Sequence, residues 1–252
     1  MNRAASRWKE MNALRILGLD TSGKVASAAI LDTGQDLLLA ERSLYTTRGH
    51  SQIMMPMVEN LLTDCGMTVQ DVDCYAVAVG PGSYTGLRIG IAAVQGMAMV
   101  HNTPCIGVST LEAMAARIFE AKNILAVMHA RADLFYCAWF SYHIYMHYDP
   151  KYLDRETPDE IQTATQIAET IDKISEGIVL VGDGAEELMK QYEAMGHEGQ
   201  TILRPAPPML RLQSAAGVCY QAAQYIEQHA ELPTAADLTA SYLQAVNITR
   251  KN

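Results

Sequence analysis

The sequence lacks the features that mark membrane proteins, disulfide-rich secreted proteins and nucleic-acid-binding proteins. It has no stretch of about 20 apolar residues, so no membrane-spanning helix is expected. Its five cysteines are odd in number and none are at C-x-x-C spacing, which argues against a disulfide framework or zinc knuckle and favours reduced thiols in the cytoplasm. No basic run offsets the formal net charge of −9, so direct binding to nucleic acid is not expected.

The most glycine-rich segment, Gly80–Gly90, lacks three patterns of known functional loops. It has no Gly-Lys-Ser/Thr, which excludes a P-loop, and Thr85 stands where a dinucleotide fingerprint needs its third glycine. Pro81 and Thr85 flank Ser83 where a nucleophile elbow needs glycines. The glycines still allow close backbone approach, and amides at a helix start can hold an anion. From the residues alone, a structural role is favoured over ligand binding.

The histidines and cysteines predict no metal site and no nucleophile. His143 and His147 are four residues apart, but they follow a predicted strand, and extended residues at that spacing lie about 13 Å apart. His50 has no histidine three or four residues away. No Ser–His–Asp arrangement is marked, and the acidic residues are scattered as on a solvated surface.

The length and the order of the elements predict two α/β domains. A chain of 252 residues, 49% of them hydrophobic, is long enough for two cores. Residues 1–10 are polar, precede a second methionine and are left out of the fold. Strands are expected at 15–20, 25–31, 37–44, 74–79, 105–108, 124–129, 134–142 and 178–181. Helices are expected at 51–65, 87–101, 109–119, 165–175, 185–195 and 214–230.

The first three strands are joined by tight turns and predict an antiparallel meander, so both sheets should be mixed and flanked by helices. We expect a first domain over 12–119 and a second, smaller domain over 120–252. The polar segments 149–158 and 204–208 are interpreted as connections, and the helix at 214–230 could pack back on the first domain.

A polar turn, Asp20-Thr21-Ser22-Gly23, follows the first predicted strand. Its hydroxyls and amides could cradle a phosphate, and Asp20 could hold a metal through water. The alternative is that Asp20 and Thr21 cap their own backbone. From the residues alone, that alternative is favoured.

Several strings are similar to one known family. They are ILGLDTSGKVASAAIL at 16–31, His50-Ser51 opening a helix, AVAVGPGSYTGLRIGIAAVQGMAM at 76–99, TPCIGVSTLEA at 103–113 and VGDGAE at 181–186. The most specific part is a signature loop made by Gly80, Pro81, Gly82, Ser83, Thr85, Gly86 and Arg88. On these residues the chain resembles the TsaB (YeaZ-type) family, which acts in the biosynthesis of tRNA threonylcarbamoyladenosine.

The resemblance implies a fold and a nucleotide-facing cleft. The fold would be two related actin/hexokinase-like (ribonuclease H-like) domains. In that superfamily the loop after the first strand faces nucleotide phosphate, and a turn in the second domain contacts adenosine. The matching residues here are Asp20, Thr21, Ser22, Gly23, Gly182, Asp183 and Gly184.

The resemblance also implies a partner. TsaD, of the same fold, would carry the metal and transfer the threonylcarbamoyl group to the adenosine next to the tRNA anticodon. Its paired histidines have only His50 as a counterpart here. This chain would be a cytoplasmic, non-catalytic scaffold and activator working with TsaD and the ATPase TsaE. It would require no cofactor, could share ATP or ADP at the interface of the complex, and would meet tRNA only through the complex.

Two rival functions stay open. A stand-alone actin-fold ATPase or small-molecule kinase predicts tight nucleotide binding and turnover by the pure chain. A metallopeptidase predicts a metal site. The chain departs from the family pattern at two places. It has His129-Ala130-Arg131 where the family has Asp-Ala-Arg, and residues 240–244 near its C-terminal end lack the usual proline and arginine. Neither departure removes a catalytic group.

The two helices expected at 51–65 and 87–101 have more apolar surface than packing against one face of a sheet would bury. The resemblance implies that relatives pair with TsaD through these helices, and that the chain alone forms a homodimer. Methionines and small residues suit such a surface because they repack and allow close approach. The predicted interface residues are Met54, Met57, Val58, Leu61, Ile89, Ala92, Ala93, Gly96, Met97 and Val100.

Overall fold

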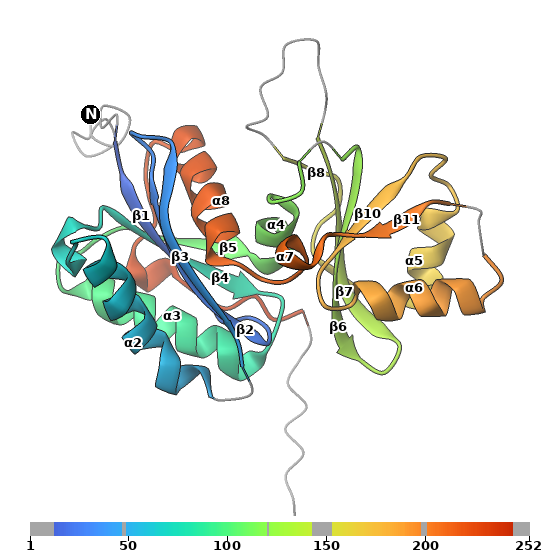
Figure 1. Ribbon diagram of the computed structural model, residues 1–252, viewed down its shortest axis with the longest axis horizontal. Helices are drawn as coiled ribbons and strands as arrows, with labels where there is room; N and C mark the ends of the chain where they lie inside the picture. Colours follow the sequence, from blue (N-terminus) through green and yellow to red (C-terminus); the bar gives the residue numbers. More distant parts are fainter. Residues whose placement is uncertain (1–12, 47–48, 120, 143–152, 198–200, 244–252) are drawn as a thin grey trace, which may run out of the picture.

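The computed structural model contains two β-sheets side by side, each with helices packed on its faces (Figure 1). It describes residues 13–46, 49–119, 121–142, 153–197 and 201–243. The predictions made for residues 1–10, His143, His147 and Gln244 therefore lie outside the described residues.

The first sheet begins with the predicted meander. Its strands are β1 (Arg15–Asp20), β2 (Val25–Asp32), β3 (Leu37–Tyr45), β4 (Cys74–Gly80) and β5 (Cys105–Ser109). They lie in the order β3-β2-β1-β4-β5. β1 pairs antiparallel with β2 and β2 antiparallel with β3, which confirms the meander, whereas β1 and β4 run parallel. Alternation along β1 sends Leu17 and Leu19 to one face and Ile16 to the other.

Helices cover both faces of this sheet. They are α2 (His50–Asp64), α3 (Tyr84–Met99), α4 (Thr110–Ala115) and α8 (Ala215–Gln228), and a short 3₁₀ turn, η1 (Val69–Asp71), follows α2. The core on the Leu17 face is completed by α2 and α3, and the core on the Ile16 face by α8. α8 comes from the C-terminal end of the chain, and a Cβ at Gly18 would lie 2.6 Å from Cys219 Sγ. Only glycine at that position of β1 allows so close an approach.

The second sheet combines two long strands, β6 and β7, with shorter ones. They are β6 (Asn123–Arg131), β7 (Leu134–Ser141), β8 (Asp154–Arg155), β9 (Glu160–Thr163), β10 (Ile178–Val181) and β11 (Leu203–Pro205). The helices α5 (Ala164–Ile171) and α6 (Ala185–Ala194) pack on one face, and α4 packs on the other. A short helix, α7 (Pro208–Arg211), and a 3₁₀ turn, η2 (Ala235–Asp237), complete the described elements. The segments interpreted as connections at 149–158 and 204–208 contain β8 and part of β11, edge strands too short for a pattern.

The two sheets repeat one topology. The second sheet has the order β11-β10-β6-β7-β8, with β6 antiparallel to β7 and parallel to β10. β9 pairs with β7 and lies off this path. If β9 is left out and the strands are numbered within each half, both sheets read 3-2-1-4-5, with β8 third and β10 fourth in the second half. This confirms the predicted fold class, two related actin/hexokinase-like halves with mixed sheets flanked by helices. The exact division at residues 119 and 120 stays a prediction.

Candidate functional site

The Asp20–Gly23 turn, which joins β1 to β2, is buried rather than open. Asp20 and Thr21 are 0% exposed. The backbone N–H and the hydroxyl of Ser22 donate to Asp20 Oδ1 at 2.8 and 2.6 Å, so Asp20 holds the turn's own backbone. Thr21 does not cap the backbone of the turn, because its hydroxyl donates to the carbonyl oxygen of Gly86 at 2.7 Å.

The signature loop between β4 and α3 lies directly on this turn. The N–H of Ser83 donates to the carbonyl oxygen of Ser22 at 2.7 Å. A Cβ at Gly82 would overlap the carbonyl oxygen of Ser22, and a Cβ at Gly86 would overlap that of Thr21. The two glycines are therefore needed for backbone contact, the structural role that the residues alone favoured. Ser83 also starts α3 earlier than the expected residue 87, because its hydroxyl accepts from the N–H of Gly86.

The side chain of Gln213 also packs against this turn. A Cβ at Gly23 would lie 2.6 Å from the Gln213 amide, which is itself buried. Within the described residues, Gln213 Nε2 and Asp20 Oδ2 are buried and have no hydrogen-bond partner. Burial raises the pKa of Asp20 to about 6, and the hydrogen bonds from Ser22 only partly oppose that rise. The folded chain therefore keeps this proton to a higher pH than an ordinary aspartic acid does.

The second predicted nucleotide-facing segment, the turn at Gly182–Gly184, follows β10. The N–H of His129 donates to Asp183 Oδ1 at 3.3 Å, so the residue in the family's Asp position supports this turn through its backbone. Burial raises the pKa of Asp183, while the positive charge of Lys24 is among the effects that lower it. Lys24 follows the Asp20–Gly23 turn directly. The structure therefore brings the two predicted segments within electrostatic range of each other.

A cluster that the sequence did not predict ties the C-terminal segment to the signature loop. Arg88 Nε donates to the Tyr242 hydroxyl at 3.1 Å, and the Arg88 guanidinium lies 4.1 Å from the centre of the Tyr84 ring. The Tyr84 and Tyr242 rings are 4.9 Å apart. The N–H of Ser241 donates to the carbonyl oxygen of Val79 at 2.7 Å. The spacing of these residues gives no signal of the contact.

The predicted interface residues on α2 and α3 separate into core and surface. Met54, Val58, Leu61 and Met97 are buried in the first core, so the structure corrects the prediction that they offer surface to a partner. Met57, Ile89 and Ala93 are half-buried, and Ala92, Gly96 and Val100 are exposed. Met55 and Met99 are also exposed, although they are not among the predicted interface residues. An apolar groove of about 470 Å³ runs beside Met55 and Val69.

The described residues contain neither a metal-binding cluster nor a membrane-spanning helix. No group of three or more His, Cys, Asp or Glu side chains there is placed to hold a metal ion. No helix there is long and apolar enough to cross a membrane. His50 opens α2, and burial lowers its pKa against the opposing effect of the Thr21 backbone.

Comparison with known proteins gives the family. A family model described as TsaD, tRNA N6-adenosine threonylcarbamoyltransferase, matches residues 44–249. The tRNA threonylcarbamoyladenosine biosynthesis protein TsaB of Escherichia coli is 32% identical over 203 residues, which are 78% of this chain and 84% of that protein. TsaB of Haemophilus influenzae is 36% identical over 129 residues, 50% of this chain, and this alignment spans about half of that protein, 53%.

Solved structures agree with this result. A crystal structure described as an uncharacterized protein with similarity to peptidase YeaZ, from Pseudomonas aeruginosa, has a TM-score of 0.71 at 25% identity. It covers 92% of this chain and 100% of that chain. YeaZ from the same organism has a TM-score of 0.70 at 23% identity over 91% of this chain and 100% of its own. The chain belongs to the TsaB (YeaZ-type) family, whose relatedness to TsaD is seen in the match to the TsaD model.

Proposed function

We propose that this chain acts in the biosynthesis of tRNA threonylcarbamoyladenosine as a non-catalytic subunit that supports a TsaD-type threonylcarbamoyltransferase. The names of its relatives support the pathway. The observation that carries the non-catalytic role is the closed Asp20–Gly23 turn. Signature-loop backbone and the Gln213 side chain both pack directly on that turn, where an actin-like enzyme would need room for phosphate.

The burial of Asp20 supports the same role. A carboxylate that positions a hydrated magnesium ion must meet water. Asp20 is fully buried. This burial weighs against a stand-alone ATPase or kinase, and we expect any affinity of the pure chain for ATP to be weak.

The surface of α2 and α3 supports docking. Met99 is 76% exposed and Val100 is 69% exposed, and both lie beside the exposed small residues Ala92 and Gly96 on or at the end of α3. An exposed apolar surface of this kind suits a helical partner, because small residues allow close approach and methionines adapt their shape. We assign this surface to a TsaD-type subunit, and to a second copy of the chain when no partner is present.

The remaining partners follow from charge. With a net charge of −9, this chain is poorly suited to hold tRNA, so the tRNA would be bound by the other subunits. A TsaE-type ATPase would join the same assembly, and ATP or ADP could bind where the subunits meet. Because its tRNA substrate is cytoplasmic, the complex would work in the cytoplasm.

A reconstitution tests the proposal. Purified TsaD-type and TsaE-type subunits from the same organism are incubated with tRNA, ATP and the threonylcarbamoyl donor, with and without this chain. We expect modification only when the chain is present, and no ATP hydrolysis above background by the chain alone. Modification that proceeds equally without the chain would refute the supporting role. ATP turnover by the chain that is lost in Asp20→Asn would instead favour the stand-alone ATPase.

A further inference from the structure

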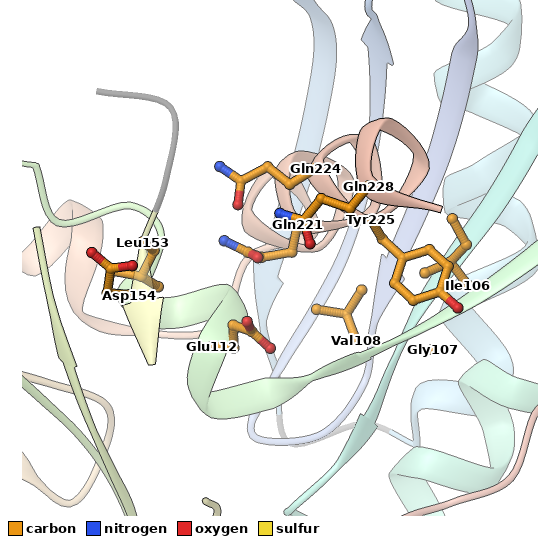
Figure 2. A pocket seen from close by; sticks show the side chains of 10 residues that line it. All are labelled: Ile106, Gly107, Val108, Glu112, Leu153, Asp154, Gln221, Gln224, Tyr225 and Gln228. Carbon is orange, nitrogen blue, oxygen red and sulfur yellow. The ribbon is translucent and has the colours of Figure 1, made fainter. Parts of the chain in front are cut away.

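A second polar site lies on α8, away from the predicted nucleotide-facing residues. It is a pocket of about 340 Å³ between α8, β5, α4 and the start of β8 (Figure 2). None of the residues 20–23 or 182–184 line it. In the view of Figure 1, β8, α4 and α8 lie toward the upper end of the boundary between the two sheets, and the lower end of β2 lies toward the opposite end. A volume of this size is within the range of small-molecule sites.

Three glutamines of α8 give the pocket its polar wall. Gln221, Gln224 and Gln228 are spaced i, i+3 and i+7, which puts them on one face of the helix. Figure 2 shows the amide groups of Gln221 and Gln224 extending from α8 toward the side where Leu153 and Asp154 lie. Each of these two side chains is only 8% exposed, and neither amide nitrogen has a hydrogen-bond partner within the described residues. Buried donors without partners are rare in folded proteins, so these two nitrogens point to an absent acceptor.

The opposite wall carries carboxylates. Glu112 comes from α4 and Asp154 from β8. Both carboxylates already have an interaction, which for Glu112 is with Arg155 Nη2, 2.9 Å from its Oε2. Among the described residues the lining contains no lysine or arginine to hold a phosphate. Carboxylates facing neutral amides are well suited to hydroxyl groups, which donate to the former and accept from the latter.

The floor between the two walls is apolar. Ile106 and Val108 of β5 line it, with Gly107 between them. A flat or ring-shaped molecule can lie on such a floor while its edge hydrogen-bonds to the walls. The glutamine amides can pair with a heterocycle that presents an acceptor beside a donor, as glutamine does with adenine.

We propose that this pocket binds a small uncharged molecule with vicinal hydroxyl groups, of the size of a nucleoside or a sugar. Its hydroxyls would donate to Glu112 and Asp154, and its acceptors would meet the amides of Gln221 and Gln224. Nucleosides and free sugars share this chemistry, whereas nucleotides add a negative charge that no lysine or arginine in the described part of the lining would offset. This site does not depend on the proposed role in tRNA modification.

Binding to the full chain tests the proposal. Adenosine, D-ribose and D-glucose are the uncharged probes and AMP is the charged one, measured by saturation-transfer NMR and calorimetry. We expect saturable binding of adenosine or of a sugar, and which of them binds identifies the source. Gln224→Leu should weaken that binding about tenfold, because it removes one hydrogen bond to the ligand. Gln70→Leu, an exposed glutamine in η1, is the matched control and should bind like the unaltered chain.

Three outcomes would overturn the proposal. The first is no binding of any uncharged probe, which would mean that only water fills the pocket. The second is binding that Gln224→Leu leaves unchanged, which would place the probe elsewhere. The third is AMP binding more tightly than adenosine through the same glutamine. Gln221→Leu repeats the test if Gln224→Leu does not fold, as judged by circular dichroism.

Discussion

The two halves of the molecule share a strand order but differ in the turn that follows their first strand. In the first half this turn, Asp20–Gly23, is closed by the signature loop. In the second half the matching turn joins β6 to β7, and Arg131 and Asp133 are exposed there. Both halves nevertheless place a glycine after the fourth strand where a side chain would collide with backbone. Gly86 meets Thr21 in the first half, and Gly182 meets Val127 in the second.

The difference shows where the duplicated fold has been specialised. The glycine contact is common to both halves, although the glycine meets the turn that follows β1 in the first half and β6 itself in the second. Loop length does not explain the difference, because three residues separate β4 from α3 and three separate β10 from α6. In the first half, Gly82 and Ser83 of this loop lie directly on the Asp20–Gly23 turn. The closed turn is therefore a feature of the first half, whereas its counterpart in the second half is exposed.

The largest expected effect comes from filling the glycine contact. Gly86→Ala should lower the free energy of unfolding by more than about 3 kcal/mol, because its methyl group would overlap the carbonyl oxygen of Thr21. Gly96→Ala is the matched control on the same helix, with nothing within 4 Å of the new carbon. It should stabilise the chain by about 0.5–1 kcal/mol, since alanine is the better helix former. Urea unfolding measures both, and equal stability of the two variants would contradict the packing.

The next effect tests the assigned partner surface. Ala92→Glu places a charge on the exposed side of α3, where water solvates it in the isolated chain but docking would desolvate it. The fold should survive, while pairing with a TsaD-type subunit should weaken by several kcal/mol, on the order of a hundredfold or more. Ala194→Glu on α6 of the other half is the control. Circular dichroism checks the fold and calorimetry the pairing. A full-strength complex formed by Ala92→Glu would move the interface elsewhere.

A pH effect distinguishes the closed turn from its exposed counterpart. The folded pKa of Asp20 is about 6 and its ordinary value is 3.8, so the folded state favours the protonated form. Stability should therefore fall as pH rises from about 4 through 6, and the ionised group should destabilise the chain by roughly 2–3 kcal/mol above that range. Asp20→Asn should flatten this slope and be the more stable protein at pH 7.5. Asp133→Asn in the exposed turn controls for loss of a charge. Thermal melts from pH 4.5 to 8 give the slopes, and parallel slopes for Asp20→Asn and the unaltered chain would refute the closure.

Much of the first half could be predicted from local patterns. Tight turns between apolar runs indicated the meander, and the glycine spacing indicated close backbone contact. The stripe on α2 indicated a buried face, but periodicity does not distinguish a face turned to the core from one turned to a partner. That is why Met54 and Met97 were assigned to the wrong surface.

Contacts between distant segments had no local signal. Gly18 meets Cys219 about two hundred positions later, and Arg88 meets Tyr242, through tertiary packing that no spacing encodes. The closure of the Asp20 turn by Gln213 is of the same kind. The edge strands β8 and β11 were missed because pairing with longer neighbours, rather than their own residues, makes them strands.

The smallest expected effect compares a helix cap in each half. Ser214 caps α8 and is buried: its hydroxyl accepts from the N–H of Ala216 at 3.2 Å and donates to Glu41 Oε1 at 2.5 Å. Thr163 caps α5 with a 3.2 Å bond from the N–H of Gln166, at a partly exposed site. Ser214→Ala should destabilise the chain by about 1–2 kcal/mol and Thr163→Ala by about 0.5–1 kcal/mol. Water can replace the lost bond at the exposed cap, whereas the buried cap leaves the N–H of Ala216 without its partner and removes one of the hydroxyl groups that donate to Glu41. Urea unfolding of the two variants would give the order, and a larger loss for Thr163→Ala would mean that α8 is not the more firmly anchored helix.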